Sequence, residues 1–106
     1  MSPISKNQRY AVYEQAARDL DEATAAHEAV LDDNQDLVIR VNQANFNFEI
    51  VEAAMEDGGV DLAEYDAANE EWGEARNALD EVTRETFRNL QEAQARAFTA
   101  YEDYIA

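Results

Sequence analysis

Apolar side chains recur every three or four residues along most of the chain, which is the spacing of one face of an α-helix. We call each such line of positions a seam. The first seam runs from Tyr10 to Leu31, and the second, which is the most regular, runs from Leu37 to Met55. The third begins at Tyr65 and shifts by one residue after Val82. Its later members are Thr83, Phe87, Leu90, Gln94, Ala97, Tyr101 and Tyr104. The seams predict helices at about 5–31, 34–57 and 61–104.

Gly58-Gly59 is the strongest break in the pattern. Glycine readily takes the left-handed conformation in which many helices end. A new helix start follows at once, because Asp61 is a good capping residue and Glu64 lies three positions after it. The sequence therefore predicts a tight turn between the second and third helices.

The other helix ends are less sharply marked. Ser5 and Gln8 have the spacing of a capping box, and Ser2-Pro3 offers an alternative start one turn earlier. The acidic and amide side chains at 32–34 can end one helix and begin the next, which gives a three-helix bundle. No glycine or proline stands there, so a continuous helix folded into a long hairpin at 58–59 is the alternative. The break is slightly favoured.

Either arrangement is an all-α fold in which neighbouring helices run antiparallel with coiled-coil-like packing. With 106 residues the chain is expected to form one helical domain, 1–106. Its apolar fraction of 46% includes 20 alanines, whereas Leu, Ile, Val and Phe together number 21. Such a core is poor in large side chains, and a two-helix hairpin this thin is expected to need association to bury its seams.

Negative charge dominates the composition and is unevenly spread. The formal net charge is −16, from 24 acidic residues against 8 basic ones. The segment 41–75 contains no basic residue, so the end of the molecule near Gly58-Gly59 is expected to be intensely negative. Direct nucleic-acid binding requires a basic patch, so we do not expect this protein to bind nucleic acid directly. No stretch is long and apolar enough for a membrane span, and no secretory signal is seen. A cytoplasmic or virion location is predicted.

Motifs for metal or catalytic chemistry are incomplete. Asp32, Asn34 and Asp36 begin like a calcium loop, but Leu37 stands where the turn needs glycine, and Gln43 stands where a bidentate glutamate is needed. The chain has one histidine and no cysteine. A di-iron site of helical bundles requires paired Glu-x-x-His motifs, which one histidine cannot supply. We therefore expect a non-enzymatic protein without a metal or cofactor.

Two surfaces are candidates for binding a protein partner. Phe46 lies off its seam among asparagines, and Tyr101 and Tyr104 form an apolar C-terminal end. An acidic surface is predicted from Glu56, Asp57, Asp61, Glu64, Glu70, Glu71 and Glu74.

The favoured function is a small structural or assembly component, virion- or scaffold-like, that associates through its helix seams. It predicts a homo-oligomer or a place in a larger assembly, with a protein partner that could be basic. The alternative is an inhibitor of a DNA-binding enzyme, of the anti-restriction or anti-CRISPR type, whose acidic surface imitates the phosphate backbone of DNA.

Overall fold

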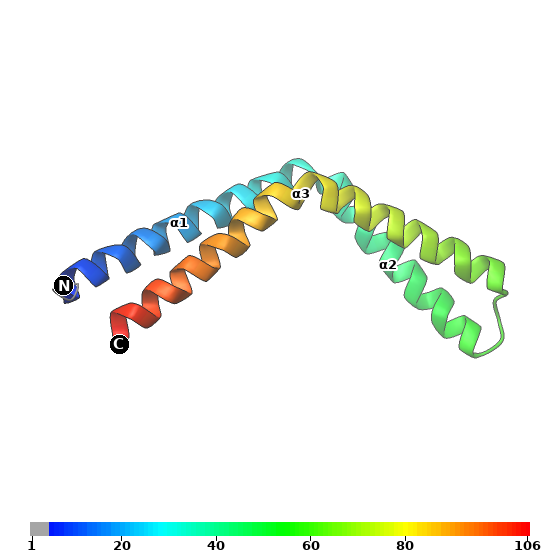
Figure 1. Cartoon of the computed structure of the whole chain (residues 1–106). Coiled ribbons are helices and arrows are strands. Elements are labelled where there is room, and N and C mark those ends of the chain that lie inside the picture. The colour runs from blue at the N-terminus through cyan, green and yellow to red at the C-terminus, as the bar shows by residue number, and fades with distance from the viewer. Residues whose placement is uncertain (1–4) are drawn as a thin grey trace. The chain divides into compact units, whose positions relative to one another are not determined.

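A computed structural model describes residues 5–106, and within this range the chain forms three α-helices and no strand. Helix α1 spans Lys6–Asp33, α2 spans Gln35–Glu56 and α3 spans Leu62–Ile105 (Figure 1). The predicted helix bounds lie within two residues of these. Helix α3 packs against α1 and against α2, which confirms the all-α class and the helical packing. The alternative helix start at Ser2-Pro3 lies outside the described residues.

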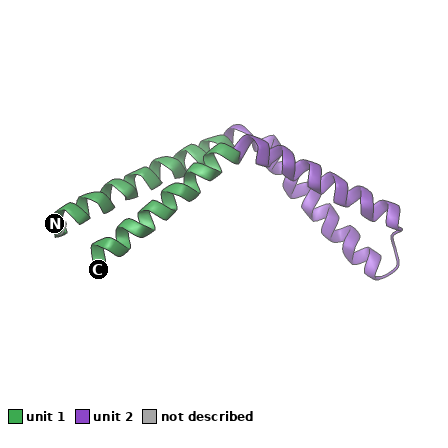
Figure 2. Cartoon of the chain, viewed as in Figure 1, with its two compact units in different colours: residues 1–30, 84–106 green, residues 31–83 purple. Residues whose placement is uncertain are grey.

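The chain divides into two compact units, each an antiparallel pair of helical segments (Figure 2). Unit 1 comprises residues 1–30 and 84–106, so that α1 lies along the second half of α3. Unit 2 comprises residues 31–83, in which α2 lies along the first half of α3. In each unit one helical segment therefore packs against a single neighbour.

The predicted helix ends are formed by the expected local contacts. The backbone N–H of Ser5 donates to Oε1 of Gln8 at 3.0 Å, and the N–H of Gln8 donates to Oγ of Ser5 at 3.2 Å. These reciprocal bonds are a capping box. At the start of α3 the N–H of Glu64 donates to Oδ1 of Asp61 at 2.9 Å. Both caps were readable from sequence spacing alone.

Helix α2 ends in a Schellman motif. Gly58 has a φ of 76°, its N–H donates to the carbonyl of Met55 at 3.0 Å, and the N–H of Gly59 donates to the carbonyl of Ala54 at 2.8 Å. This pair of bonds satisfies carbonyls that the end of a helix leaves free.

The break between α1 and α2 is confined to one residue. Asn34 has φ −122° and ψ 39°, and its side chain forms no capping hydrogen bond. The three-helix alternative is therefore correct in its number of helices, although each unit is only two helical segments thick.

The interior of both units is made of very small side chains. Among residues 5–106 the buried positions are Ala16, Ala44, Ala68, Ala75, Ala93, Ala100 and Thr83. No large side chain is fully buried there. Small residues at a helix contact allow the backbones to approach closely, and the larger seam residues close the interface from its two sides while remaining half-exposed.

The third seam is partly corrected by the structure. Its shift at Thr83 is real, since Ala75, Leu79 and Thr83 face inward at two consecutive steps of four. Beyond that point the inward positions are Thr86, Leu90, Ala93, Ala97, Ala100 and Tyr104. The predicted members Phe87, Gln94 and Tyr101 are exposed instead. Each lies one residue from a smaller Thr or Ala that fits the close helix contact.

Candidate functional site

The surface exposes far more large apolar side chains than the interior buries. Eleven are exposed among the described residues: Tyr10, Val12, Ile39, Phe46, Ile50, Leu62, Val82, Phe87, Phe98, Tyr101 and Ile105. Single exposed hydrophobic residues are ordinary on a soluble protein, whereas contiguous groups mark contact surfaces. Two sets of these side chains each share one face of a helix, one set on each unit.

The first group is a line on the outer side of α2, which we call the α2 stripe. It consists of Ile39, Phe46 and Ile50, whose side chains are 51%, 65% and 52% exposed. At 100° per residue, spacings of seven and four place them within about 40° of one another. The inward positions, Ala44 and Phe48 among them, lie roughly on the opposite side of the helix. Helix α2 is therefore apolar on two faces.

The second group lies on α3 within unit 1, and we call it the α3 flank. It consists of Phe87, Phe98, Tyr101 and Ile105, which are 49%, 64%, 46% and 61% exposed. Helical geometry places them within about 60° of one another, to one side of the face that packs on α1. The third seam places Phe87 and Tyr101 in the interior, although Tyr101 is also one of the residues predicted for the apolar C-terminal end. The sequence therefore indicates only part of this surface.

A cluster of four tyrosines adjoins the α3 flank. Tyr13 stacks on Tyr104 with ring centroids 5.9 Å apart and an interplanar angle of 12°, and it contacts Tyr101 at 5.8 Å. Tyr10 packs on Tyr104 at 5.4 Å. Two of the predicted partner-binding residues thus also hold α1 to α3. Tyr104 is half-buried, whereas nearly half of Tyr101 is left exposed.

Arg9 ties the start of α1 to the end of α3. Its Nη1 donates to the carbonyl oxygens of Asp103 at 3.2 Å and Ala106 at 3.1 Å. The end of a helix leaves its last carbonyls without intrahelical partners, and a cation there is favourable. Within the described chain, Nε of Arg9 is buried and makes no hydrogen bond. This arginine is therefore engaged in structure and is not free to contact a partner.

The two units differ in net charge. Unit 1 contains six basic residues against nine acidic ones, for a net charge of −3. Unit 2 contains two basic residues against fifteen acidic ones, for a net charge of −13. The uneven distribution that the sequence indicated therefore coincides with the division of the fold.

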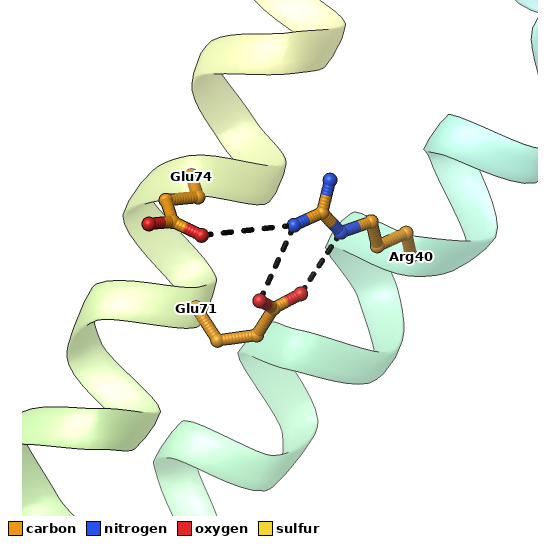
Figure 3. A network of polar contacts seen from close by, with 3 residues as sticks. All are labelled: Arg40, Glu71 and Glu74. Atoms are coloured by element: carbon orange, nitrogen blue, oxygen red, sulfur yellow. Dashed lines mark hydrogen bonds and ion pairs between the residues drawn. The ribbon is translucent and has the colours of Figure 1, made fainter.

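Both arginines of unit 2 are engaged within the unit. Nε of Arg40 donates to Oε1 of Glu71 at 2.9 Å and Nη2 donates to Oε2 at 3.2 Å, while Oε2 of Glu74 lies 4.0 Å from Nη2 (Figure 3). The hydrogen bond to Arg40 lowers the pKa of Glu71, and the same contact raises the pKa of Arg40. The guanidinium carbon of Arg76 lies 4.6 Å from the centroid of the Trp72 ring.

The seven predicted acidic residues are all exposed, but they are not equivalent. Glu71 and Glu74 pair with Arg40, so part of their charge is neutralised inside unit 2. Asp61 caps α3 and Asp57 occupies the C-cap of α2. The remaining side chains, which enter no described ion pair, belong to Glu56, Glu64 and Glu70.

The candidate metal ligands do not come together in the part of the chain that the structure describes. No group of three or more His, Asp or Glu side chains in residues 5–106 is arranged to hold a metal ion. His27 is half-buried, with Nδ1 hydrogen-bonded to Oγ1 of Thr86 at 3.0 Å and its ring 5.9 Å from that of Phe87. Across the same residues no helix has the length and apolarity needed to cross a membrane.

A groove between α1 and α3 lies on the other side of unit 1 from the α3 flank. Val12, Ala16, Ala95, Thr99 and Ala100 supply most of its lining. The other lining residues are Gln15, Asp19, Arg96 and Asp103. The groove follows from the small residues on both helices.

No protein family, curated protein or solved structure matches the chain. The functional argument accordingly depends on the two apolar surfaces and the distribution of charge.

Proposed function

We propose that the protein is a non-enzymatic structural or assembly component, virion- or scaffold-like, whose copies associate through their exposed apolar helix faces. The observation that supports this is that small side chains are buried while large apolar side chains are exposed. Among residues 5–106 the buried positions are six alanines and a threonine, whereas eleven large apolar side chains are exposed. A helix pair that leaves these side chains in water gains most from a second helix pair that covers them.

Each unit is only two helical segments thick. The exposed apolar side chains of a unit therefore have no third helix of the same unit to cover them, and a second copy can supply that cover.

The test is the absolute molar mass of the full chain, measured by light scattering on a sizing column at near-physiological salt. The proposal expects a discrete helical multimer, and a helical 12.0 kDa species at every concentration would contradict it. The variant Phe98→Asp should reduce the mass, because it places a charge in the α3 flank. The control Val12→Asp carries the same change on the groove side of unit 1 and should leave the mass unchanged.

A DNA-mimic inhibitor is the second candidate, and one observation favours it. Unit 2 has a net charge of −13, and both of its arginines are already engaged. Such a surface attracts a basic cleft electrostatically. The test is salt-sensitive binding to a panel of DNA-binding enzymes. Replacing Glu56, Glu64 and Glu70 by Gln should weaken binding strongly, while unchanged affinity would exclude this role for the acidic surface. Glu71 is unsuitable for this test because it pairs with Arg40.

A further inference from the structure

We propose that copies of this chain associate through two different surfaces, with the α3 flank of one copy covering the α2 stripe of another. This inference rests on the proposed assembly function and adds the geometry of the contact. It follows from two surfaces that are both apolar but differ in the charge around them.

The α2 stripe is bordered by carboxylates. Glu49 and Glu56 are seven residues apart and lie on one side of the stripe, and Asp36 lies near its N-terminal end on the other. The one basic residue of α2, Arg40, is held by Glu71 and Glu74. The stripe therefore presents an apolar ridge of Ile39, Phe46 and Ile50 with an uncompensated negative border.

A second α2 stripe is a poor occupant for this surface. A symmetric contact between two copies brings the same patch against itself. Here it would bring Glu49 and Glu56 of one copy close to those of the other, between two units that each have a net charge of −13. Juxtaposed like charges at an interface are strongly unfavourable.

The α3 flank has the complementary character. Arg84 precedes Phe87 by three residues and Arg88 follows it by one, so both lie beside the flank on the side away from α1. Both arginines are exposed, and neither takes part in an ion pair within residues 5–106. Two unpaired cations thus lie beside the Phe87 end of the flank, whereas carboxylates border the α2 stripe.

The two surfaces belong to different units of the same chain. Their contact therefore joins two different surfaces. It either repeats from copy to copy, which closes into a ring or extends as a filament, or it is made twice in a two-fold dimer in which each copy offers both surfaces to the other. A single substitution that blocks one surface leaves the other surface competent. This property separates the flank-to-stripe contact from every dimer in which one surface pairs with itself.

The experiment combines two matched variants, Phe46→Asp and Phe98→Asp. The side chains are 65% and 64% exposed, so that neither change disturbs an interior contact, and circular dichroism checks that helicity is retained. Each variant alone is expected to be a monomer in light scattering, because it lacks one of the two surfaces. A one-to-one mixture is expected to form a heterodimer of about twice the 12.0 kDa mass, through the intact flank of one and the intact stripe of the other.

The controls are Val12→Asp in unit 1 and Leu62→Asp in unit 2, at side chains that are 58% and 61% exposed. Both add the same charge outside the proposed contact and should assemble as the unsubstituted chain does. If Phe46→Asp alone still forms a dimer, the flank pairs with itself and the inference is wrong. If the mixture stays monomeric while the unsubstituted chain is multimeric, the assembly function survives and the flank-to-stripe contact does not. If the unsubstituted chain is monomeric, both proposals fail.

Discussion

Alanine sets the packing of this protein at the scale of single residues. Ala75 and Ala93 are the most deeply buried positions described, with 0% and 1% of their surface exposed. A methyl group buries little area, so each such contact contributes little to the hydrophobic stabilisation. Small side chains allow the helices to approach closely. Larger neighbours such as Phe87 do not fit between the helices and lie at the surface.

Gly58 is the residue whose backbone conformation the turn most depends on. Its φ of 76° lies in the left-handed region. A Cβ added at this position meets nothing within 4 Å, so a substitution by alanine introduces backbone strain without a steric clash. Gly58→Ala should lower the free energy of unfolding by about 1–2 kcal/mol. Gly73→Ala is the control, because Gly73 is helical with open space around a Cβ, and this change should stabilise by roughly 0.5–1 kcal/mol. Urea unfolding followed by circular dichroism measures both, and a stable Gly58→Ala chain would contradict the role of the turn.

The pairing of Glu71 with Arg40 has a pH signature. The pKa of Glu71 is lowered in the folded chain by the hydrogen bond from Arg40. A lowered carboxyl pKa contributes stability above the ordinary pKa of the group, and that contribution is lost as the pH falls through the folded value. The Tm difference between the unsubstituted chain and Glu71→Gln should therefore be positive at pH 7 and shrink below about pH 4. Glu70→Gln is the matched control without an ion pair, and an identical pH profile for the two variants would contradict the assignment.

At the scale of elements, α2 and α3 show how far a helical pattern can be read from sequence. The inward face of α2, from Leu37 to Met55, is predicted correctly because large residues mark it. Phe46 was recognised as off the seam, but Ile39 and Ile50 were not joined to it, although their spacing of seven and four already indicated one stripe. A helix with two apolar faces gives a weak amphipathic signal, and which face is covered depends on the neighbouring helix.

In the second half of α3 the large apolar residues do not mark the inward face. A search for large apolar residues selects Phe87 and Tyr101, whereas the close contact with α1 selects Thr86 and Ala100. The positions differ by one residue, which rotates the helix by about 100°. Sequence alone could not decide between them, because the distance between two helices depends on the side chains of both. The caps were predictable because they involve only residues three positions apart.

The close helix contact in unit 2 can be tested by overpacking. Ala75→Leu adds three carbon atoms where no surface is exposed, so the two helices must separate or the side chain must adopt a strained rotamer. The free energy of unfolding should fall by about 1–3 kcal/mol. Ala67→Leu makes the same change at an exposed position of the same helix and should be nearly neutral. Thermal unfolding by circular dichroism gives the comparison, and equal stability of the two variants would show that α2 and α3 do not approach closely.

At the scale of the whole molecule, the two units combine similar folds with different surfaces. Unit 2 carries most of the net charge and unit 1 carries most of the basic residues. The sequence predicted the acidic segment because charge can be counted along the chain. It could not predict which acids remain free, since the pairing of Arg40 with Glu71 joins residues on different helices.

We propose that association covers the large apolar side chains that the chain leaves exposed. Association that favours the folded state raises its stability with concentration by mass action. The measurement to make is therefore the Tm of the full chain over a hundredfold range of protein concentration, followed by circular dichroism. Tm is expected to rise by several degrees across this range. A Tm that is independent of concentration would show that each copy folds alone, and association would then not be what stabilises the fold.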